Sequence, residues 1–409
     1  MQDLLWKKPK NFQYLFLDMN AFFASCEQQA HPEFRNRPLV VTPTVCDNGC
    51  IITASYEARA YKIKTGFTVR QARTLYPNII IRPSDTFLYL KYHQKFIRLI
   101  SQITPFYQVK SIDEVVIRIS PTDQTQENSL AFGKYIKSQI SQHLGEHITS
   151  SIGIAPNPFL AKLAAESKKP DGLTLLCLDK LKHFYNTCKL TDFCGINFRM
   201  QNRLNRYNIY TPMDFYNADI NILKKYFGKI GQQWYLKLHG YDTLDDFALS
   251  LPKTISQSHV LEPLCRTWPI AWSVCQKLFF KAAKRLREAR LCAKTIVLLV
   301  KTLDYTYQKQ YFKTEYINDN FTLTRYFKKL WDKINKYDRP LKIIVVFTNL
   351  CNYSTPQQQL FSHPNKEQHL SHAIDKINNA YGKNKIISAS MLKNIKHAPD
   401  RISFGQPKF

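Results

Sequence analysis

The order of apolar and polar positions along the first part of the chain predicts alternating strands and helices. Short apolar or β-branched runs with the length of buried strands lie at residues 14–17, 39–42, 51–53, 115–119 and 147–154. Apolar side chains recur at helical spacing in residues 21–29, 55–61, 87–103, 129–143 and 159–167. This alternation predicts an α+β sheet, and we expect the helices to cover one of its faces.

The pattern changes near residue 178. The β-branched runs stop there, and short polar helices are punctuated by glycines at positions 195, 228, 231 and 240. Residues 251–261, which contain Pro252, predict an extended linker that runs into a strand. A second α+β unit follows, with helices expected at 270–290 and 324–336 and strands at 294–302, 307–316 and 341–348. The 409 residues exceed what one hydrophobic core usually organises, so we expect several domains.

Composition places the chain among folded proteins. The sequence is 44% hydrophobic and 13% aromatic with only 12 glycines, which is ample material for packed cores. The longest apolar runs, such as residues 295–300 and 343–347, are far shorter than the roughly 20 residues that span a bilayer. Residues 1–10 lack the apolar core and cleavage site of a secretory signal. We therefore expect a cytoplasmic protein without a membrane partner.

The cysteines predict no disulfide framework. Ten cysteines are scattered without a CxxC pair, and a cytosolic protein keeps such thiols reduced. Only Cys46 and Cys50 lie close together, in the loop VCDNGC. No second Cys or His pair with zinc spacing accompanies them, so we expect no metal site there. The cysteines as a whole are expected to be mostly packing residues.

Charge adds a partner to this picture. The chain carries 58 Lys and Arg against 31 Asp and Glu, a net charge of +27. A polyanion gains affinity when each Lys or Arg that it meets releases a counterion. Nucleic acid is therefore the favoured partner, and a merely soluble basic surface or an anionic membrane is the alternative.

Acidic side chains mark the ends of two predicted strands. Asp18 ends the first apolar run, and Asp113 and Glu114 open a later strand. Carboxylates at the ends of neighbouring strands suit Mg²⁺, which takes oxygen ligands. Two such ions stabilise both the attacking and the leaving oxygen of a phosphoryl displacement. The three acids predict nucleotidyl transfer with two Mg²⁺ ions, although each acid alone could be a solvated strand end or a helix cap.

Four motifs surround these acids and carry a family resemblance. They are FLDMNAFFASCEQ at 16–28, SYEARAYKIKTG at 55–66, SIDEV at 111–115 and GIAPNPFLAKLAAESKKPDG at 153–172. In order and spacing, over essentially the whole chain, they closely resemble the Y-family DNA polymerases, and within them the DNA polymerase IV group. The resemblance implies a multi-domain α+β right hand with a ferredoxin-like palm, small fingers, a helical thumb and an α+β little finger.

The resemblance also assigns ranges to these domains. It implies a palm at residues 1–19 and 86–177, fingers at 20–85 and a thumb at 178–248. A linker at 249–256, a little finger at 257–395 and a C-terminal tail at 396–409 complete the chain. The segment KTISQSHVL at 253–261 resembles the family's linker and first little-finger strand.

Metal and sugar contacts follow from the matched motifs. Asp18, the backbone carbonyl of Met19, Asp113 and Glu114 would bind the metal ions. Phe23 occupies the position of the steric gate, where a flat ring leaves no room for a ribose 2′-hydroxyl, and Phe22 would support the sugar and triphosphate. Without the resemblance, both rings would be read as ordinary core residues.

The triphosphate contacts are implied in the same way. Thr53, Tyr56 and Arg59 would contact the triphosphate, and Lys169 would neutralise it. Such donors preorganise charge where the leaving pyrophosphate develops. Without the surrounding motifs, Arg59 and Lys169 would be read as solvated surface residues.

Two departures from the family pattern are visible. Val115 stands where the family commonly has alanine, which leaves the neighbouring acids untouched. The family usually places helix-hairpin-helix turns in the thumb, whose backbone N–H groups hold DNA phosphates. Here residues 193–197 read FCGIN, without the usual second glycine, so the phosphate grip of the thumb is not assured by this segment.

A short peptide near the C-terminus indicates a protein partner. Gln357, Leu360 and Phe361 in QQQLF resemble the peptide by which bacterial polymerases dock on the sliding clamp. Leu and Phe would fill a pocket while Gln fixes the register, so that a few anchors supply most of the binding energy. We therefore expect a sliding clamp among the partners.

Together these features predict a low-fidelity, translesion DNA polymerase that acts in DNA damage tolerance as a monomer. Its partners would be primer–template DNA, deoxynucleoside triphosphates and the clamp. The short fingers leave no large closing lid, and no stretch remains for a proofreading exonuclease. The alternatives are the catalytic subunit of a multi-subunit mutagenic polymerase and a non-catalytic DNA-binding accessory protein of the same fold.

Overall fold

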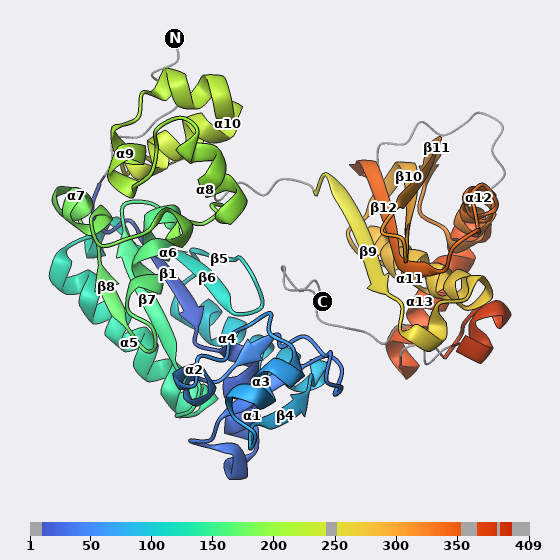
Figure 1. Cartoon of the computed structure of the whole chain (residues 1–409), viewed down its shortest axis with the longest axis horizontal. Helices are drawn as coiled ribbons and strands as arrows, with labels where there is room; N and C mark the ends of the chain where they lie inside the picture. The colour runs from blue at the N-terminus through green and yellow to red at the C-terminus, as the bar shows by residue number, and fades with distance from the viewer. Residues whose placement is uncertain (1–9, 243–251, 353–365, 383–384, 395–409) are drawn as a thin grey trace. The chain divides into compact units, whose positions relative to one another are not determined.

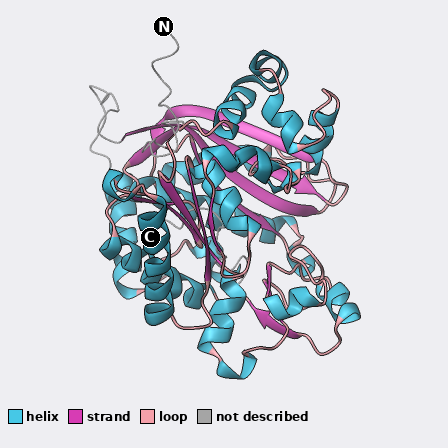
Figure 2. Ribbon diagram, turned by 90° about the vertical axis from the view of Figure 1, so that its left-hand side faces the viewer, coloured by secondary structure: helices cyan, strands magenta, loops and turns pink. Residues whose placement is uncertain are grey.

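The computed structural model describes residues 10–242, 252–352, 366–382 and 385–394. These residues fall into two compact units, one ending at residue 242 and the other beginning at residue 252 (Figure 1). Helices and strands are mixed in both units (Figure 2). The α+β class that the sequence predicts is confirmed.

A five-stranded sheet organises the first unit. Its strands lie in the order β5 (Tyr107–Val109), β6 (Glu114–Arg118), β1 (Tyr14–Met19), β7 (Ser150–Ala155) and β8 (Leu173–Leu175). The central strand β1 is antiparallel to both neighbours, and its register pairs Asp18 with Glu114 and Met19 with Ser150. Each of the six residues of β1 is buried, because layers of helices lie on both sides of it.

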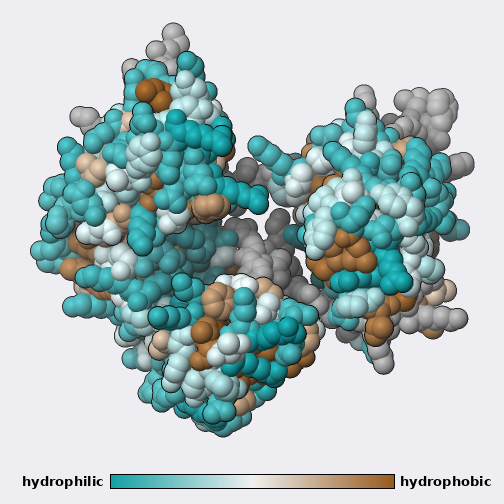
Figure 3. Space-filling view, in the orientation of Figure 1, coloured by the Kyte–Doolittle hydropathy of each residue, from teal (hydrophilic) through white to brown (hydrophobic). Residues whose placement is uncertain are grey.

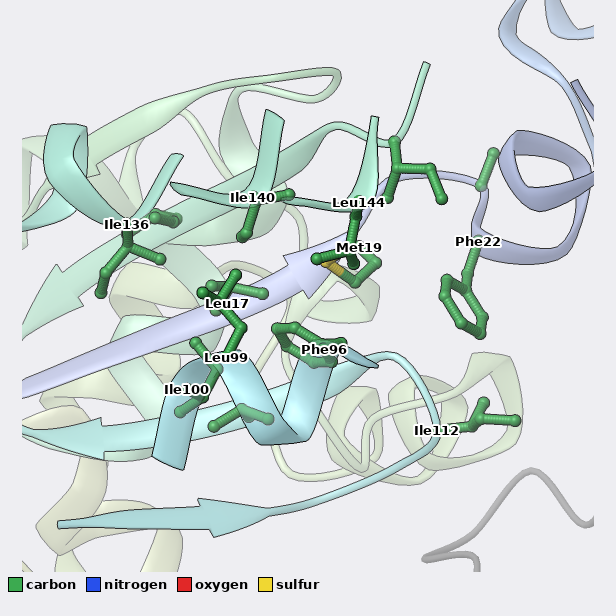
Figure 4. Packing of buried hydrophobic residues seen from close by; sticks show 14 of the residues in the cluster. Leu17, Met19, Phe22, Phe96, Leu99, Ile100, Ile112, Ile136, Ile140 and Leu144 are labelled. Atoms are coloured by element: carbon green, nitrogen blue, oxygen red, sulfur yellow. The ribbon is translucent and has the colours of Figure 1, made fainter. Parts of the chain in front are cut away.

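One layer consists of α4 (Thr86–Ile103) and α5 (Gln126–Leu144). Side chains alternate along β1, so Leu15, Leu17 and Met19 point to this layer. Figure 4 shows Leu17 and Met19 among apolar side chains of both helices, namely Phe96, Leu99, Ile100, Ile136, Ile140 and Leu144. The helical spacing at 87–103 and 129–143 therefore predicted the core of this layer correctly.

The other layer is α6 (Pro158–Ser167), and it makes our expectation of a sheet covered on one face wrong. Tyr14 and Phe16, the alternate residues of β1, share a buried cluster with this helix. Gly153 on β7 allows the helix to come close, because a Cβ there would lie 2.0 Å from the carbonyl oxygen of Ala161. The apolar face of α6 needed a partner, and the second face of the sheet provides it.

A smaller sheet follows in the chain between β1 and α4. It has the order β3 (Thr53–Ala54), β2 (Leu39–Thr42) and β4 (Ile80–Pro83), with β4 parallel to β2. The helices of this region are α1 (Phe22–Ala30), α2 (Tyr56–Ala60) and α3 (Val69–Leu75). The sequence patterns predicted α1, α2 and β2, placed β3 too early, and missed α3 and β4, which are short and half exposed.

Short helices fill the rest of the first unit, as expected for residues 178–240. They are α7 (Leu181–Tyr185), α8 (Phe198–Asn205), α9 (Pro212–Asn217) and α10 (Ile220–Leu238). Two buried hydrogen bonds secure them: Tyr185 donates to the Leu238 carbonyl at 2.6 Å, and Tyr14 of β1 donates to Asp242 at 2.5 Å. These residues belong to the same compact unit as the five-stranded sheet.

The second unit contains a four-stranded antiparallel sheet. Its order is β11 (Tyr307–Ile317), β10 (Leu291–Thr302), β12 (Pro340–Asn352) and β9 (Thr254–Val260). Its helices are α11 (Trp268–Glu288), α12 (Asn320–Asp332) and α13 (Lys366–Tyr381). The sequence patterns missed α13, whose Asp375 forms a 2.6 Å ion pair with the buried Arg287 of α11.

In the part of the chain that the structure describes, short 3₁₀ helices lie at Pro32–Phe34, Pro121–Asp123, Leu178–Lys180, Leu190–Asp192, Pro263–Cys265 and Ala389–Asn394. The visible face of each unit is mainly hydrophilic with scattered apolar patches (Figure 3). Within the described ranges, no helix combines the length and the apolar character needed to cross a membrane. All ten cysteines are free thiols, and Cys46 and Cys50 are exposed.

Candidate active site

The five-stranded sheet brings the predicted acidic residues to one end. Asp18 on β1 lies opposite Glu114 on β6 in the antiparallel register. Asp113 immediately precedes β6, and its carbonyl accepts a 2.9 Å hydrogen bond from the backbone N–H of Met19. Residues almost 100 positions apart in sequence therefore become neighbours through strand pairing.

Burial raises the pKa of two of the acids at this end of the sheet. Asp18 is only 7% exposed, and burial raises its pKa from 3.8 to about 7, although Lys169 opposes the shift and Glu166 and Asp113 add to it. Burial also raises the pKa of Asp113, against a hydrogen bond from Ser111 and with repulsion from Glu114. A cation near these acids would offset the free-energy cost of burying their negative charges and would reduce the repulsion between them.

Two lysines of the α6 segment meet the acids. Lys169 Nζ lies 2.9 Å from Asp18 Oδ1 and 2.8 Å from Glu166 Oε1, while Lys162 Nζ lies 2.5 Å from Glu114 Oε1. Although burial lowers the pKa of each lysine, the neighbouring carboxylates raise it above its usual value. Lys169 was predicted to neutralise triphosphate, and here it neutralises Asp18.

Lys162 and Glu166 were missed in the sequence. Their spacing of four residues puts both on one face of α6, and Lys169 lies three residues further on. The apolar face of α6 packs on the sheet, and the edge of the helix that carries Lys162 and Glu166 then lies near the acids. The alternation of Lys, Glu and Lys at helical spacing was a usable signal, once the motif around it was known.

The acids offer a donor set suited to hard divalent ions. Asp18, Asp113 and Glu114 supply carboxylate oxygens, and Met19, whose carbonyl is the fourth predicted donor, follows Asp18 on β1. As they stand, no three Asp, Glu, His or Cys side chains in the described part of the chain are gathered as a metal cluster. The positive charges beside two of the acids are the ammonium groups of Lys162, next to Glu114, and of Lys169, next to Asp18. The chemistry of the residues therefore fits magnesium, and these residues remain predicted ligands.

Tyr56 and Arg59 form a second part of the site. The guanidinium of Arg59 lies 4.5 Å from the centre of the Tyr56 ring, and its Nε donates to the Ala54 carbonyl at 3.1 Å. The Tyr56 hydroxyl is buried yet makes no hydrogen bond within the described residues. Burial raises the pKa of the Tyr56 hydroxyl above its usual value. The positive charges of Arg59 and Lys169 lower this pKa, and the negative charge of Asp18 raises it. The hydroxyl therefore interacts electrostatically with both parts of the site.

The remaining residues of the predicted pocket lie in α1 and β3. Phe22 and Phe23 are 2% and 4% exposed, with ring centres 5.7 Å apart. Phe23 stacks on Tyr89 of α4 at 4.6 Å. Thr53 is buried at the start of β3, three residues before Tyr56. These roles remain predictions from the matched motifs.

The segment FCGIN borders a hollow of about 860 Å³ beside α6. Gly195 in this segment has a φ of 90°, which favours glycine, and Asn197 caps α8 by accepting a hydrogen bond from the Met200 N–H. Lys162 and Glu166 line the same hollow. The hollow therefore adjoins the charged edge of α6.

A glycine turn lies within α10. The helical path breaks at Gly228, which has a φ of 62° and separates two helical segments. A Cβ on Gly231 would lie 2.2 Å from the Leu223 carbonyl oxygen, so only glycine lets the two segments approach. The two glycines in FGKIG at 227–231 were the available signal for this turn. The predicted clamp residues Gln357, Leu360 and Phe361 lie outside the described residues.

Family models match both units of the chain. The impB/mucB/samB family model matches residues 17–166, and the model of the C-terminal domain of that family matches residues 252–360. Together the two ranges span more than half of the sequence. The first contains the acids, the predicted gate and the lysine of α6 that contacts Glu114.

Individual proteins agree with this match. DNA polymerase IV of Moorella thermoacetica is 28% identical over 388 residues, which cover 92% of this chain and 96% of that protein. DNA polymerase IV of Staphylococcus epidermidis is 26% identical over 333 residues, which cover 81% and 93%. A solved Y-family DNA polymerase chimera of Dbh and Dpo4 has a TM-score of 0.70 at 23% identity, covering 83% of this chain and 99% of that one. An insertion ternary complex of Dbh DNA polymerase has a TM-score of 0.57 with the same identity and coverage.

The mixed α+β fold, the two matched family models and the DNA polymerase IV relatives together define the class of this protein, a DNA polymerase. The chain belongs to the impB/mucB/samB family, that of the Y-family DNA polymerases.

Proposed function

We propose that this chain is a translesion DNA polymerase that adds deoxynucleotides to a primer 3′ end by two-metal-ion nucleotidyl transfer. The observation that supports the mechanism is that β-strand pairing brings three acids to one end of the sheet, in the unit that also holds a buried hydroxyl with no hydrogen bond within the described residues. Asp18, Asp113 and Glu114 provide the acids, and Tyr56 provides the hydroxyl. The polymerase relatives support the activity.

Magnesium is the proposed cofactor. Asp18, Asp113, Glu114 and the Met19 carbonyl would hold two ions, in keeping with their oxygen donors and the raised pKa values of two of the acids. When bound, such ions stabilise the attacking and the leaving oxygen of the phosphoryl displacement. The lysines that now face the acids would then be released for other anions.

The chain's own residues bind and orient the incoming nucleotide. Lys169 would exchange its contact with Asp18 for the triphosphate, which offers more negative charge. Arg59 would donate to the same group with its two remaining guanidinium nitrogens, and the Tyr56 hydroxyl, which makes no hydrogen bond within the described residues, would gain one. Once the nucleotide is bound, these donors would stabilise the charge that develops on pyrophosphate.

Primer–template DNA is the proposed macromolecular partner. A net charge of +27 supports binding through phosphates, which makes affinity salt-sensitive and nearly independent of sequence. The glycine turn at 227–231, between two helical segments, is of the kind that presents backbone N–H groups to phosphate. It supplies a candidate for the grip that FCGIN alone did not assure.

Low fidelity follows from the small region between β1 and α4. Its three-stranded sheet and short helices are too slight to build a large closing lid over the nascent pair. Enzymes gain selectivity when the correct substrate drives such a closure. A polymerase without it would accept damaged templates and reject mismatches poorly.

Activity of the purified chain tests the proposal directly. With magnesium, one primer–template and four deoxynucleotides, the chain alone should extend the primer. Extension only after other subunits are added would favour the multi-subunit mutagenic polymerase. DNA binding without extension under both conditions would favour a non-catalytic accessory protein.

Replacing Tyr56 with phenylalanine should raise the KM for deoxynucleotides several-fold while leaving stability nearly unchanged. The hydroxyl makes no hydrogen bond within the described residues, so its loss should cost less than about 0.5 kcal/mol of unfolding free energy. Tyr185→Phe is the matched control, because its hydroxyl donates to the Leu238 carbonyl and its loss should cost about 1 kcal/mol. Steady-state kinetics and thermal unfolding measure both effects. An unchanged KM for Tyr56→Phe would remove Tyr56 from the pocket.

Deleting residues 357–361 should reduce extension on clamp-loaded DNA and spare extension on a bare primer. The reason is that Leu360 and Phe361 would be the apolar anchors of a clamp-binding peptide. Primer extension with and without the loaded clamp measures the difference. Equal loss on both substrates would argue against a clamp contact and point to a defect in the second unit.

A further inference from the structure

We infer that Tyr89 is a positioning residue for the sugar-selecting ring of Phe23, and that Glu27, paired with Arg82, holds Tyr89 in place. The inference rests on the proposed function, in which Phe23 borders the sugar of the incoming nucleotide. It assigns a role in sugar selection to three residues outside the predicted pocket.

The first observation is the stacked pair. The ring centres of Phe23 and Tyr89 are 4.6 Å apart, and the ring planes make an angle of 29°. Phe23 is 4% exposed and Tyr89 is fully buried. The Tyr89 ring therefore supports one face of Phe23 from within the core, at the distance favoured by aromatic pairs.

The second observation is a carboxylate with no exposure to solvent. Glu27 lies one helical turn after Phe23 on α1, and its relative exposure is 0%. Its Oε1 accepts a 2.8 Å hydrogen bond from the Tyr89 hydroxyl, and its Oε2 accepts a 3.0 Å hydrogen bond from Arg82 Nε. An isolated buried carboxylate is costly, so the two donors fix its position.

The charges around Tyr89 keep its hydroxyl protonated, so that it can donate to Glu27. Burial and the neighbouring Glu27 carboxylate raise the pKa of Tyr89 well above its ordinary value, so the hydroxyl stays protonated and keeps donating. Arg82 balances the carboxylate and also lies 5.0 Å from the ring centre of Phe34. His31, 3.8 Å from Glu27, is the other titratable neighbour in ion-pair range.

These contacts form a chain that runs through three elements and ends at Phe23. Arg82 comes from β4, Glu27 from α1 and Tyr89 from α4, and the chain of contacts ends on the Phe23 ring. Steric exclusion of a 2′-hydroxyl requires a ring that cannot turn aside, because packed side chains give way only at an energetic cost. The anchored tyrosine supplies that stiffness, and the extra oxygen of a ribonucleotide is the group that it helps to exclude.

The test compares sugar selectivity in Tyr89→Phe and in the unchanged chain. The measured quantity is kcat/KM for a deoxynucleotide divided by kcat/KM for the matching ribonucleotide, in single-nucleotide primer extension. We expect this ratio to fall roughly fivefold, because the ring remains while its anchor is lost. Tyr185→Phe is the matched control, since it also loses a buried tyrosine hydrogen bond but lies in the helical region after residue 178.

A double substitution separates positioning from general loosening. Once Phe23→Ala has removed the gate, adding Tyr89→Phe should not lower the ratio further, because Tyr89 acts through Phe23. Independent effects in the double variant would overturn the inference. Glu27→Gln keeps an oxygen that can accept from Tyr89, so it should lower the ratio less than Glu27→Ala does.

The outcomes distinguish this inference from the function on which it rests. If Phe23→Ala leaves the ratio unchanged, the gate assignment itself is wrong. If Phe23→Ala lowers the ratio but Tyr89→Phe does not, the gate stands and the positioning role is overturned. If Tyr185→Phe lowers the ratio as much as Tyr89→Phe, the effect reflects lost stability, and the positioning role is likewise overturned.

Discussion

Replacing Asp113 with asparagine is expected to reduce primer extension by about a thousandfold or more, because one of the charged ligands of the proposed metal pair is lost. The amide has nearly the same shape, so the hydrogen-bonded end of β6 should persist. Burial raises the pKa of Asp113, which means that the folded chain favours a neutral group there. We therefore expect thermal stability to be equal or higher, measured by thermal unfolding.

The matched control is Asp123→Asn, the same change at an exposed position of the short helix Pro121–Asp123. It should leave extension within about twofold of the unchanged chain. DNA binding by the Asp113 variant, measured by fluorescence anisotropy, should persist because phosphate contacts carry most of it. Undiminished extension by Asp113→Asn would exclude this acid from the chemistry.

Replacing Phe23 with alanine is expected to admit ribonucleotides, with sugar selectivity falling by about a hundredfold. The ring is 4% exposed and stacks on Tyr89, so its removal opens space at the base of the proposed pocket. Loss of a buried phenylalanine also costs roughly 3 kcal/mol or more of stability, so kinetics should be measured well below the unfolding temperature. Incorporation of ribonucleotides and deoxynucleotides opposite one template base measures the ratio.

Phe87→Ala serves as the control, because Phe87 is 81% exposed at the start of α4. It removes an aromatic ring from the same region without opening the core, and the selectivity ratio should stay the same. Unchanged selectivity in Phe23→Ala would instead assign the ring to the core alone, which is the plain interpretation of its burial.

Much of the fold followed from local patterns. Long periodic segments predicted α4, α5, α6 and α11 within a few residues, since burial of one helix face leaves a strong period in the sequence. Short elements such as β4 and β8 were missed, because three or four half-buried residues leave no clear period. The double-sided cover of the five-stranded sheet was also missed, since which face a helix chooses is decided by contacts distant in sequence.

The site shows the same division. The acids could be found at strand ends, and the matched motifs supplied the predicted nucleotide contacts, which stay predictions. The partner of each acid could not be found, because Lys169 meets Asp18 and Lys162 meets Glu114 only after α6 packs on the sheet. The role of Tyr89 likewise depends on α4 lying beside α1, which no single motif encodes.

The missing side chain at Gly153 has a consequence for the charge balance of the site. Gly153 has no side chain, so the backbone of α6 packs directly against the backbone of β7 at this point, and the helix lies close to the sheet. That nearness decides how far the ammonium groups of Lys162 and Lys169 reach over the acids. One methyl group at position 153 would act as a spacer beneath the helix, and it would weaken the attraction between charges without altering any of them.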